Sequence, residues 1–316
     1  MIICNQETNK YVGIKMSNYQ QTLKGLRAYK QIELNNEKNL QFFLDKHSTK
    51  EGTWGHLTVH EGTIEFVFLD GEGNELSHHT LNSNSPSQII PPASWHKIAS
   101  TSADFKATLQ FYCQSHRYFE KKYRLGAMHH DLWTIYQTYL RDSKKLSILD
   151  VGCGSGRNPL YFSLSEHNVI GLDKNENAID NIRHIAAQEQ LSNIEAVVHD
   201  LNQPLTIKDK SFDFIYSTVA IQFLNRTSIK PLLTNLQSLT STGGMHFLVF
   251  PIKAEPYKYP ESFTYLAETN ELYHFYQDSG WSILEYKEKP GQLHKLDETG
   301  KPKQGIFGQL LAQKHF

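Results

Sequence analysis

Short runs in which apolar and polar residues alternate fill the chain between Arg27 and Cys113. Segments such as 63–70 and 104–113 place an apolar side chain at about every second position, which is the period of a half-buried β-strand. The apolar run 40–44 fits the same series, and clusters of Gly, Asn, Ser and Pro separate the runs. This spacing predicts a small all-β sandwich or barrel.

The pattern changes at Gln114, where charged and aromatic residues alternate at the spacing of an amphipathic helix as far as Leu125. A second helical pattern covers 132–142. We therefore place a domain junction here, with a β domain over residues 1–115 and a second domain over 116–316.

Beyond residue 145 the apolar runs alternate with helical patterns, as a parallel β-sheet requires. The expected strands are 146–151, 168–172, 194–199, 212–217, 245–250, 281–287 and 306–313. No helical pattern separates the last two runs, so they predict an antiparallel tail on a parallel sheet. The second domain is thus expected to be a Rossmann-like α/β fold with a seven-stranded mixed sheet.

The first of these strands runs directly into three alternating glycines, Gly152, Gly154 and Gly156. Glycines at a strand-to-helix turn let the backbone adopt positive φ and let a ligand approach closely. Dinucleotide sites use a different glycine spacing. Asp150 stands two positions before the first glycine, where a carboxylate suits a cationic ligand better than a pyrophosphate. S-adenosylmethionine, which carries an ammonium and a sulfonium but no phosphate, fits this pattern.

Polar residues follow the next strands at the points where a nucleoside would be bound. Asp173 ends a strand about 20 residues beyond the glycine loop, where a carboxylate can accept both ribose hydroxyls. Asp200 follows the next strand and is placed to accept the adenine amino group, and Ser217 and Thr218 end the fourth strand. In open α/β sheets ligands bind at these carboxyl ends. Together the residues predict an S-adenosylmethionine-dependent methyltransferase.

Composition narrows the class of partner. The formal net charge is −1 and the pI about 7.0, and no Lys/Arg-rich block occurs, so we expect no nucleic-acid partner. No apolar run approaches the length of a membrane span, and we expect a cytoplasmic protein. The cysteines Cys4, Cys113 and Cys153 are scattered and odd in number, which predicts reduced thiols.

Histidines in the β domain raise the question of a metal. His56 and His60 share one strand face, with His47 upstream and His96 downstream. The spacing H-x-x-x-H differs from the H-x-H of metal-binding cupin barrels. We favour a barrel without a metal. Whether these four histidines bind a metal or another small ligand is left open.

The ordered motifs resemble a known family, the tellurite-resistance methyltransferases TehB in the long form with an N-terminal cupin-like domain. The motifs that carry the resemblance are LDVGCGSGRNPLYFS, VIGLDKN, FDFIYSTVAIQFLNR, GQLHKLDETG and QGIFGQLLAQK, with GTWGHLTVHEG and IIPPASWH in the N-terminal half. The resemblance implies a cupin-like β-barrel ahead of a class I methyltransferase domain. It also implies methylation of tellurite, and of related chalcogen oxyanions such as selenite, as a detoxification step. This chain departs from the family in having Pro159 and His130 where serines are expected.

The resemblance also implies a set of site residues. The cofactor-binding set is Asp150, Gly152, Gly154, Gly156, Asn158, Asp173, Lys174, Asp200, Leu201, Ser217 and Thr218, with Tyr118, Tyr123 and His129 as wall residues from the segment ahead of the sheet. An oxyanion needs cationic or hydrogen-bonding groups, and the basic candidates are His294, Lys295, Arg157 and Arg226. We expect GQLHKLD to form a loop over the carboxyl edge of the sheet.

Two hypotheses from different classes remain open. In the first, the protein is a methyltransferase for a small acceptor, an oxyanion or another compound such as a thiol, and its β domain is a lid or the surface of a homodimer. In the second, it is a cupin-type binding or sensing protein with a non-catalytic Rossmann-like domain. The intact set of Asp150, Asp173 and Asp200 favours the first.

Overall fold

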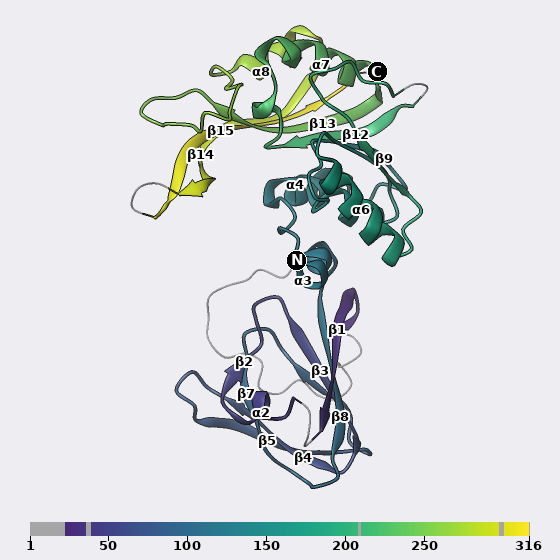
Figure 1. The fold of residues 1–316 in the computed structure, drawn as a ribbon, viewed down its shortest axis with the longest axis vertical. Coiled ribbons are helices and arrows are strands. Elements are labelled where there is room, and N and C mark those ends of the chain that lie inside the picture. Colours follow the sequence, from purple (N-terminus) through teal and green to yellow (C-terminus); the bar gives the residue numbers. More distant parts are fainter. Residues whose placement is uncertain (1–22, 36–38, 208–209, 297–299, 316) are drawn as a thin grey trace. The chain divides into compact units, whose positions relative to one another are not determined.

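The computed structural model describes residues 23–315 except 36–38, 208–209 and 297–299, and for 294–296 it describes the backbone alone. The chain divides into two compact units, which meet in the sequence between Arg124 and Leu125 (Figure 1). Each unit is described separately below.

The first unit consists of two four-stranded antiparallel sheets, with strand orders β1-β8-β3-β6 and β2-β7-β4-β5. Their strands are β1 (Leu26–Asn35), β2 (His47–Ser48), β3 (Trp54–Glu61), β4 (Thr63–Leu69), β5 (Glu75–Asn82), β6 (Gln88–Ile90), β7 (Trp95–Thr101) and β8 (Lys106–Gln114). Alternating residues such as Leu57, Ile64, Phe66 and Leu109 form the core between the sheets. The all-β prediction for this region is confirmed.

One predicted strand in this unit is wrong. The run 40–44 forms the short helix α2 (Gln41–Leu44). Leu40, Phe43 and Leu44 pack against the core, whereas Phe42 is 78% exposed. Apolar contacts at positions separated by three and four residues follow the period of a helix, which a run of five residues does not reveal.

The first unit ends in a 3-10 turn, η2 (Ser115–Arg117), and the helix α3 (Tyr118–Tyr123). Arg117 and Glu120 form an ion pair at 2.8 Å on this helix. The helix stops at Arg124, whose φ of +59° is left-handed. The predicted junction therefore contains a helix, although it is shorter than the pattern suggested.

The second unit is built on a seven-stranded sheet of order β11-β10-β9-β12-β13-β15-β14. Its strands are β9 (Ser147–Val151), β10 (Asn168–Asp173), β11 (Ile194–Val198), β12 (Phe212–Thr218), β13 (Thr240–Ile252), β14 (Ser282–Leu296) and β15 (Pro302–Gln313). The first five are parallel, and β15 pairs antiparallel with both β13 and β14. The predicted mixed sheet with its antiparallel tail is confirmed. The strand order reverses between β9 and β12, so the ligand site is expected there.

Helices cover both faces of this sheet (Figure 1). One face packs against α4 (His130–Ile135), the π-helical turn η3 (Tyr136–Leu140) and α5 (Pro159–Leu164). The other packs against η4 (Ile221–Phe223), α7 (Arg226–Ser238) and α8 (Glu271–Asp278). The helix α6 (Glu176–Gln188) contacts β10 and β11. Sequence reasoning missed α8, which has only eight residues.

The expected loop at GQLHKLD is wrong, because β14 continues through this motif to Leu296. Gly291 pairs with Gly305 in the hairpin with β15. A Cβ at Gly291 would lie 2.7 Å from the Phe307 ring, and one at Gly305 would lie 2.7 Å from the Tyr259 ring. The two glycines thus make room for aromatic rings and let the hairpin extend.

Candidate functional site

The glycine loop begins where β9 ends, and the backbone amides of Gly152 and Cys153 both donate to the Leu172 carbonyl at 2.9 Å. Gly152 has φ +85°, and a Cβ there would lie 2.2 Å from Cβ of Ala220, so this position admits only glycine. Gly154 has φ +51°, and a Cβ there would meet no atom within 4 Å. The loop therefore has no free space beside Gly152 and open space beside Gly154, where a ligand can approach the backbone.

Asp173, at the end of β10, is tied to this loop. One carboxylate oxygen accepts the amide of Gly154 and the other accepts the amide of Asn175, both at 2.9 Å. Asn175 in turn caps α6 by accepting from the amide of Ala178. Each carboxylate oxygen retains lone pairs for a further donor, so Asp173 can accept ribose hydroxyls while it holds the loop.

Asp150 lies at the base of the loop and is completely buried. Its Oδ2 accepts the Tyr216 hydroxyl at 2.8 Å, whereas its Oδ1 is buried without a hydrogen-bond partner. Burial raises the pKa of Asp150 to about 8, against the opposing effects of the Tyr216 hydrogen bond and the Arg157 charge. An unpartnered buried carboxyl oxygen beside an open loop suits a cationic ligand group.

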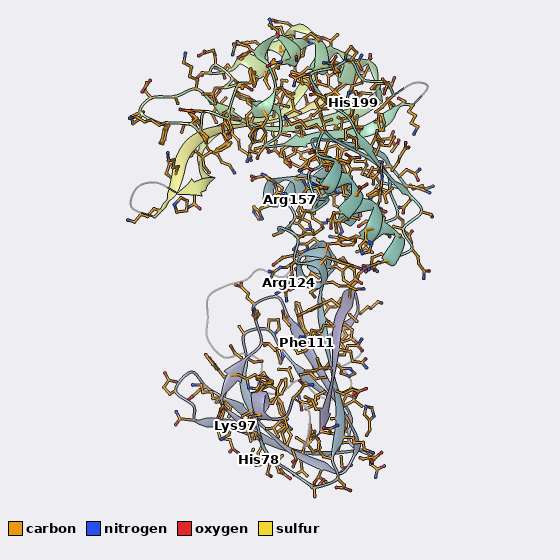
Figure 2. All side chains as sticks on the ribbon, viewed as in Figure 1. His78, Lys97, Phe111, Arg124, Arg157 and His199 are labelled. Carbon is orange, nitrogen blue, oxygen red and sulfur yellow. The ribbon has the colours of Figure 1, made fainter. Side chains whose placement is uncertain are left out.

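Arg157 follows the last glycine of the loop (Figure 2). Its side chain is half-buried. Burial lowers its pKa, although the charge of Asp150 opposes that effect. Within the described part of the chain its guanidinium forms no ion pair and no hydrogen bond. A partly buried guanidinium without an ion pair or hydrogen bond favours an anion as its ligand.

Asn158 connects three parts of the site. Its Nδ2 donates to Oγ1 of Thr218 at 3.1 Å, and its Oδ1 accepts the backbone amide of His129 at 3.0 Å. The helix α5 begins directly after it at Pro159, whose missing N–H is tolerated in the first turn. Asn158 thereby fixes the start of α4 over the ends of β9 and β12.

The imidazole of His129 is largely buried. Burial lowers its pKa to about 4, and the charge of Arg157 acts in the same direction. The ring is therefore neutral near pH 7. Its Nδ1 is buried without a partner.

Sequence reasoning missed a polar cluster formed by Asp131, Lys289 and Gln309. The Asp131 carboxylate accepts from the Lys289 ammonium at 2.9 Å and from the Gln309 amide at 2.5 Å. Lys289 on β14 and Gln309 on β15 lie 158 and 178 residues beyond Asp131 on α4, so no local motif joins them to it. The one available signal was Gln309 itself, a polar residue in the apolar run IFGQLLA.

The remaining predicted cofactor residues lie at the same edge of the sheet. The Ser217 hydroxyl donates to the Val151 carbonyl at 2.8 Å and so joins β12 to β9. Asp200 is exposed and accepts from the amide and side chain of Asn202, both at 3.0 Å. Those bonds lower its pKa. Leu201 is buried near the Gly152 position, and Lys174 is exposed.

Three of the other predictions have different outcomes. Arg226 is engaged elsewhere: it donates to Glu271 and to the Leu266 carbonyl, both at 3.1 Å. The side chains of His294 and Lys295 lie outside the described residues. Tyr118 and Tyr123 belong to the first unit, and their role as wall residues stays a prediction.

No three His, Cys, Asp or Glu side chains within the described ranges are grouped as metal ligands would be. Of the four candidate histidines, His47 and His96 meet across neighbouring strands with ring centroids 4.2 Å apart. His56 contacts the Tyr112 ring, and His60 bonds to Thr108. Cys113 and Cys153 are buried free thiols, and Cys4 lies outside the described residues.

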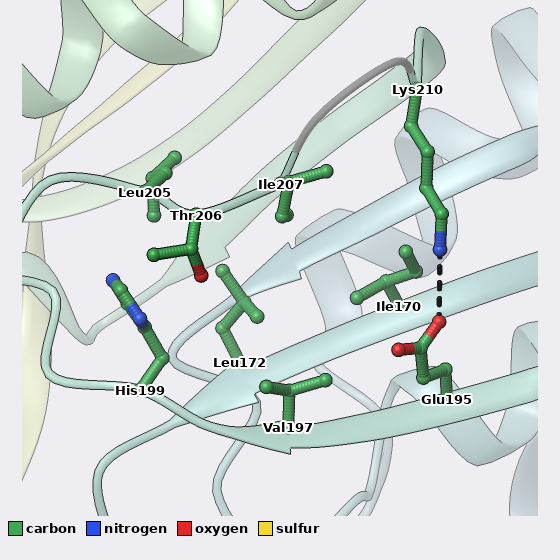
Figure 3. A pocket seen from close by; sticks show the side chains of 9 residues that line it. All are labelled: Ile170, Leu172, Glu195, Val197, His199, Leu205, Thr206, Ile207 and Lys210. Carbon is green, nitrogen blue, oxygen red and sulfur yellow. Dashed lines mark hydrogen bonds and ion pairs between the residues drawn. The ribbon is translucent and has the colours of Figure 1, made fainter.

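A groove lies beside β10 and β11, on the face of the sheet that carries α7 (Figure 3). Its walls are Ile170, Leu172, Val197, His199 and the segment 205–207, and the Glu195–Lys210 ion pair closes one end at 2.9 Å. Asp150 and Thr218 project from the opposite face, with the residues that pack against α4. The groove is therefore separate from the polar site.

The fold defines the class of protein. Parallel strands with an antiparallel tail, a glycine loop at the reversal of strand order and acids at the following strand ends make up a class I S-adenosylmethionine-dependent methyltransferase fold. A putative methyltransferase from Bacillus halodurans has the same fold, with a TM-score of 0.50 and 15% identity over 60% of this chain and 100% of that one.

The chain belongs to the TehB family. A family model described as "Tellurite resistance protein TehB" matches residues 111–311, and a second, "TehB-like domain", matches residues 30–109. A probable S-adenosyl-L-methionine-dependent methyltransferase TehB of Haemophilus influenzae is 37% identical, over 92% of this chain and 98% of that protein. The crystal structure of TehB from Haemophilus influenzae matches with a TM-score of 0.84 and 36% identity, over 92% of this chain and 99% of that one.

No helix in the described ranges is long and apolar enough to cross a membrane.

Proposed function

We propose that this protein transfers a methyl group from S-adenosylmethionine to a small chalcogen oxyanion, tellurite or selenite, as a resistance reaction. Membership of the TehB family and the methyltransferase fold establish the S-adenosylmethionine-dependent class. The acceptor is the part of the proposal that goes beyond this class.

The residues of the site fit the cofactor. The buried, unpartnered Oδ1 of Asp150 suits the ammonium, the open face of Gly154 leaves room for the ligand, and Asp173 can accept ribose hydroxyls. The exposed Asp200 is available to the adenine amino group. When bound, S-adenosylmethionine supplies an electrophilic methyl group on a sulfonium.

Arg157 carries the assignment of an anionic acceptor. Its guanidinium is half-buried and, among the described residues, has neither an ion-pair nor a hydrogen-bond partner. A small oxyanion would supply the missing negative charge, and a guanidinium can bind it through two parallel hydrogen bonds.

The chain's own contribution to catalysis is then positioning and exclusion of water. A chalcogen(IV) centre has its own lone pair, so methylation there requires no proton removal from the acceptor. The apolar packing of α4 against the sheet keeps water from the base of the site, which strengthens the electrostatic hold of Arg157 on the anion. Alignment of the acceptor with the methyl group contributes more to the rate than exclusion of water does.

A panel of acceptors tests the proposal. The full-length protein is incubated with S-adenosylmethionine and tellurite, selenite or a small thiol, and release of S-adenosylhomocysteine is measured. We expect the two oxyanions to give the higher kcat/KM. Turnover with the thiol but not with the oxyanions would replace the proposed acceptor while leaving the enzyme class unchanged.

A further inference from the structure

Gln309 presents an unsatisfied carbonyl oxygen inside the second unit. Its side chain is 3% exposed, its Nε2 donates to Asp131, and its Oε1 is buried without a hydrogen-bond partner. A buried polar atom left without a partner costs about 1–3 kcal/mol. Such a site is expected to receive a donor from a ligand.

The register of the sheet places Gln309 beside the methyltransferase site. Thr218 pairs with Val249, and Val249 pairs with Gln309, so the three residues form a row across β12, β13 and β15. Neighbouring strands are about 4.8 Å apart, which puts Gln309 roughly 10 Å from Thr218 along this row. Thr218 is the residue that Asn158 fixes next to the glycine loop.

Gln309 and Thr218 also project from the same face of the sheet. Phe307 and Leu311, on either side of Gln309 at alternate positions, pack in the cluster that includes Tyr216, two residues before Thr218. Because side chains alternate along a strand, Gln309 and Thr218 share the face that α4 covers. His129 and Asp131, at the start of α4, lie over this row.

The polar cluster of Asp131, Lys289 and Gln309 also supplies a cation. The Lys289 ammonium has three N–H donors and is 2.9 Å from Asp131, so it retains donors for another ligand. The charges of Lys289 and Arg157 both act to lower the pKa of His129. The site thus combines the Lys289–Asp131 ion pair with two buried polar atoms that lack partners, Oε1 of Gln309 and Nδ1 of His129.

We propose that Lys289 and Gln309 form the acceptor subsite and select a monoprotonated oxyanion, a species with one negative oxygen and one O–H group. The ammonium of Lys289 would hold the negative oxygen, and Oε1 of Gln309 would accept the O–H. This inference rests on the proposed function and specifies the form of its substrate. A fully deprotonated oxyanion leaves Oε1 of Gln309 unsatisfied, and a neutral acid lacks the charge that Lys289 holds.

Binding of two selenium oxyanions tests the inference without turnover. Near pH 7 selenite is largely hydrogen selenite, with one O–H, whereas selenate has none. Calorimetric titration of the full-length protein saturated with S-adenosylhomocysteine measures the affinity for each. We expect selenite to bind at least about tenfold more tightly than selenate, the equivalent of one buried hydrogen bond.

Matched variants assign the effect to residues. Gln309→Met preserves the length of the side chain, and we expect it to lower the selenite-to-selenate ratio by about tenfold. Lys289→Met should weaken both anions together. Gln313→Met and Lys287→Met, on the same two strands, serve as controls and should leave both affinities unchanged. Circular dichroism and melting temperature confirm that each variant is folded.

The outcomes separate this inference from the proposed function. The subsite is overturned if the wild-type protein binds selenite and selenate equally well. It is also overturned if folded Gln309→Met has the same selenite-to-selenate affinity ratio as the wild type. Either result indicates that Gln309 only packs or binds water. If the ratio depends on Gln309 but no oxyanion is methylated, the subsite stands and the proposed reaction fails. If oxyanions are methylated and Gln309→Met keeps the wild-type ratio, the reaction stands and the subsite fails.

Discussion

The carboxylate of Asp173 accepts the backbone amide of Gly154 at 2.9 Å, so the acid at the end of β10 and the glycine loop after β9 form one structural unit. The same side chain also accepts the amide of Asn175, which leads into α6. A residue expected to bind ribose therefore also sets the shape of the loop that cradles the ligand. Substitutions at Asp173 will affect both tasks.

We predict that Asp173→Ala weakens S-adenosylmethionine binding by about 2 kcal/mol or more, because it removes charge-assisted hydrogen bonds from a partly buried site. Asp173→Asn keeps one acceptor oxygen and should lose less. Calorimetric titration of both variants gives the two affinities. Wild-type affinity in folded Asp173→Ala would remove this residue from the cofactor site.

A second prediction concerns pH and Asp150. Its folded-state pKa is about 8, well above the usual carboxyl value near 3.9, so between those values the folded protein retains a proton that the unfolded chain has lost. The free energy of unfolding should therefore fall as pH rises from about 4 to about 8. In Asp150→Asn this contribution disappears. The free energy of unfolding of the variant should therefore rise relative to that of the wild type as pH increases from about 4 to about 8.

Denaturant unfolding of both proteins at several pH values, without cofactor, measures the difference. If the difference in free energy of unfolding between the two proteins is constant from pH 4 to 8, Asp150 is not held in its protonated form. Asp180→Asn, an exposed carboxylate on α6, is the matched control and should show no such trend.

The two predicted arginines should behave differently. Arg157→Met should lower kcat/KM for tellurite at least tenfold, about 1.4 kcal/mol, because it removes a cation that has no ion-pair partner among the described residues. Arg226→Met should chiefly lower the melting temperature, since Arg226 binds Glu271 and the Leu266 carbonyl. If Arg157→Met instead weakens S-adenosylmethionine binding and leaves kcat at saturating cofactor unchanged, Arg157 holds the cofactor carboxylate.

The domain boundary predicted at residues 115/116 is open to a truncation test. A protein that begins at His116 should fold alone and bind S-adenosylmethionine, since every residue assigned to the cofactor follows that point. A shorter protein that begins at Leu125 lacks Tyr118 and Tyr123. Weaker binding by the shorter protein alone would support those tyrosines as wall residues, and equal binding by both would exclude them.

The sequence predicted the features of this fold that rest on local patterns. Alternating residues predicted the β unit, and the run from Lys145 to Tyr161 predicted strand, loop and helix in the observed order. It failed where a contact between distant segments decides the structure. The run 40–44 became helical because its apolar face packs against a core made by other strands, and Asp131 meets Lys289 and Gln309 only because α4 crosses the antiparallel tail.

The last prediction concerns His294 and Lys295, which occupy the end of β14, where the sequence pattern suggested a loop. The family motif GQLHKLD implies that they bind the oxyanion. An imidazole and an ammonium bind a small anion only from close range, and they matter most once water is excluded. We predict that His294→Ala and Lys295→Ala each lower kcat/KM for tellurite at least tenfold, about 1.4 kcal/mol, with S-adenosylmethionine affinity little changed. If both residues instead only stabilise the β14–β15 hairpin, the variants will have a lower melting temperature, while the folded fraction keeps its specific activity. Lys287→Ala, on the same strand, is the control, and melting temperature, cofactor affinity and tellurite turnover measured on the same preparations separate the two outcomes.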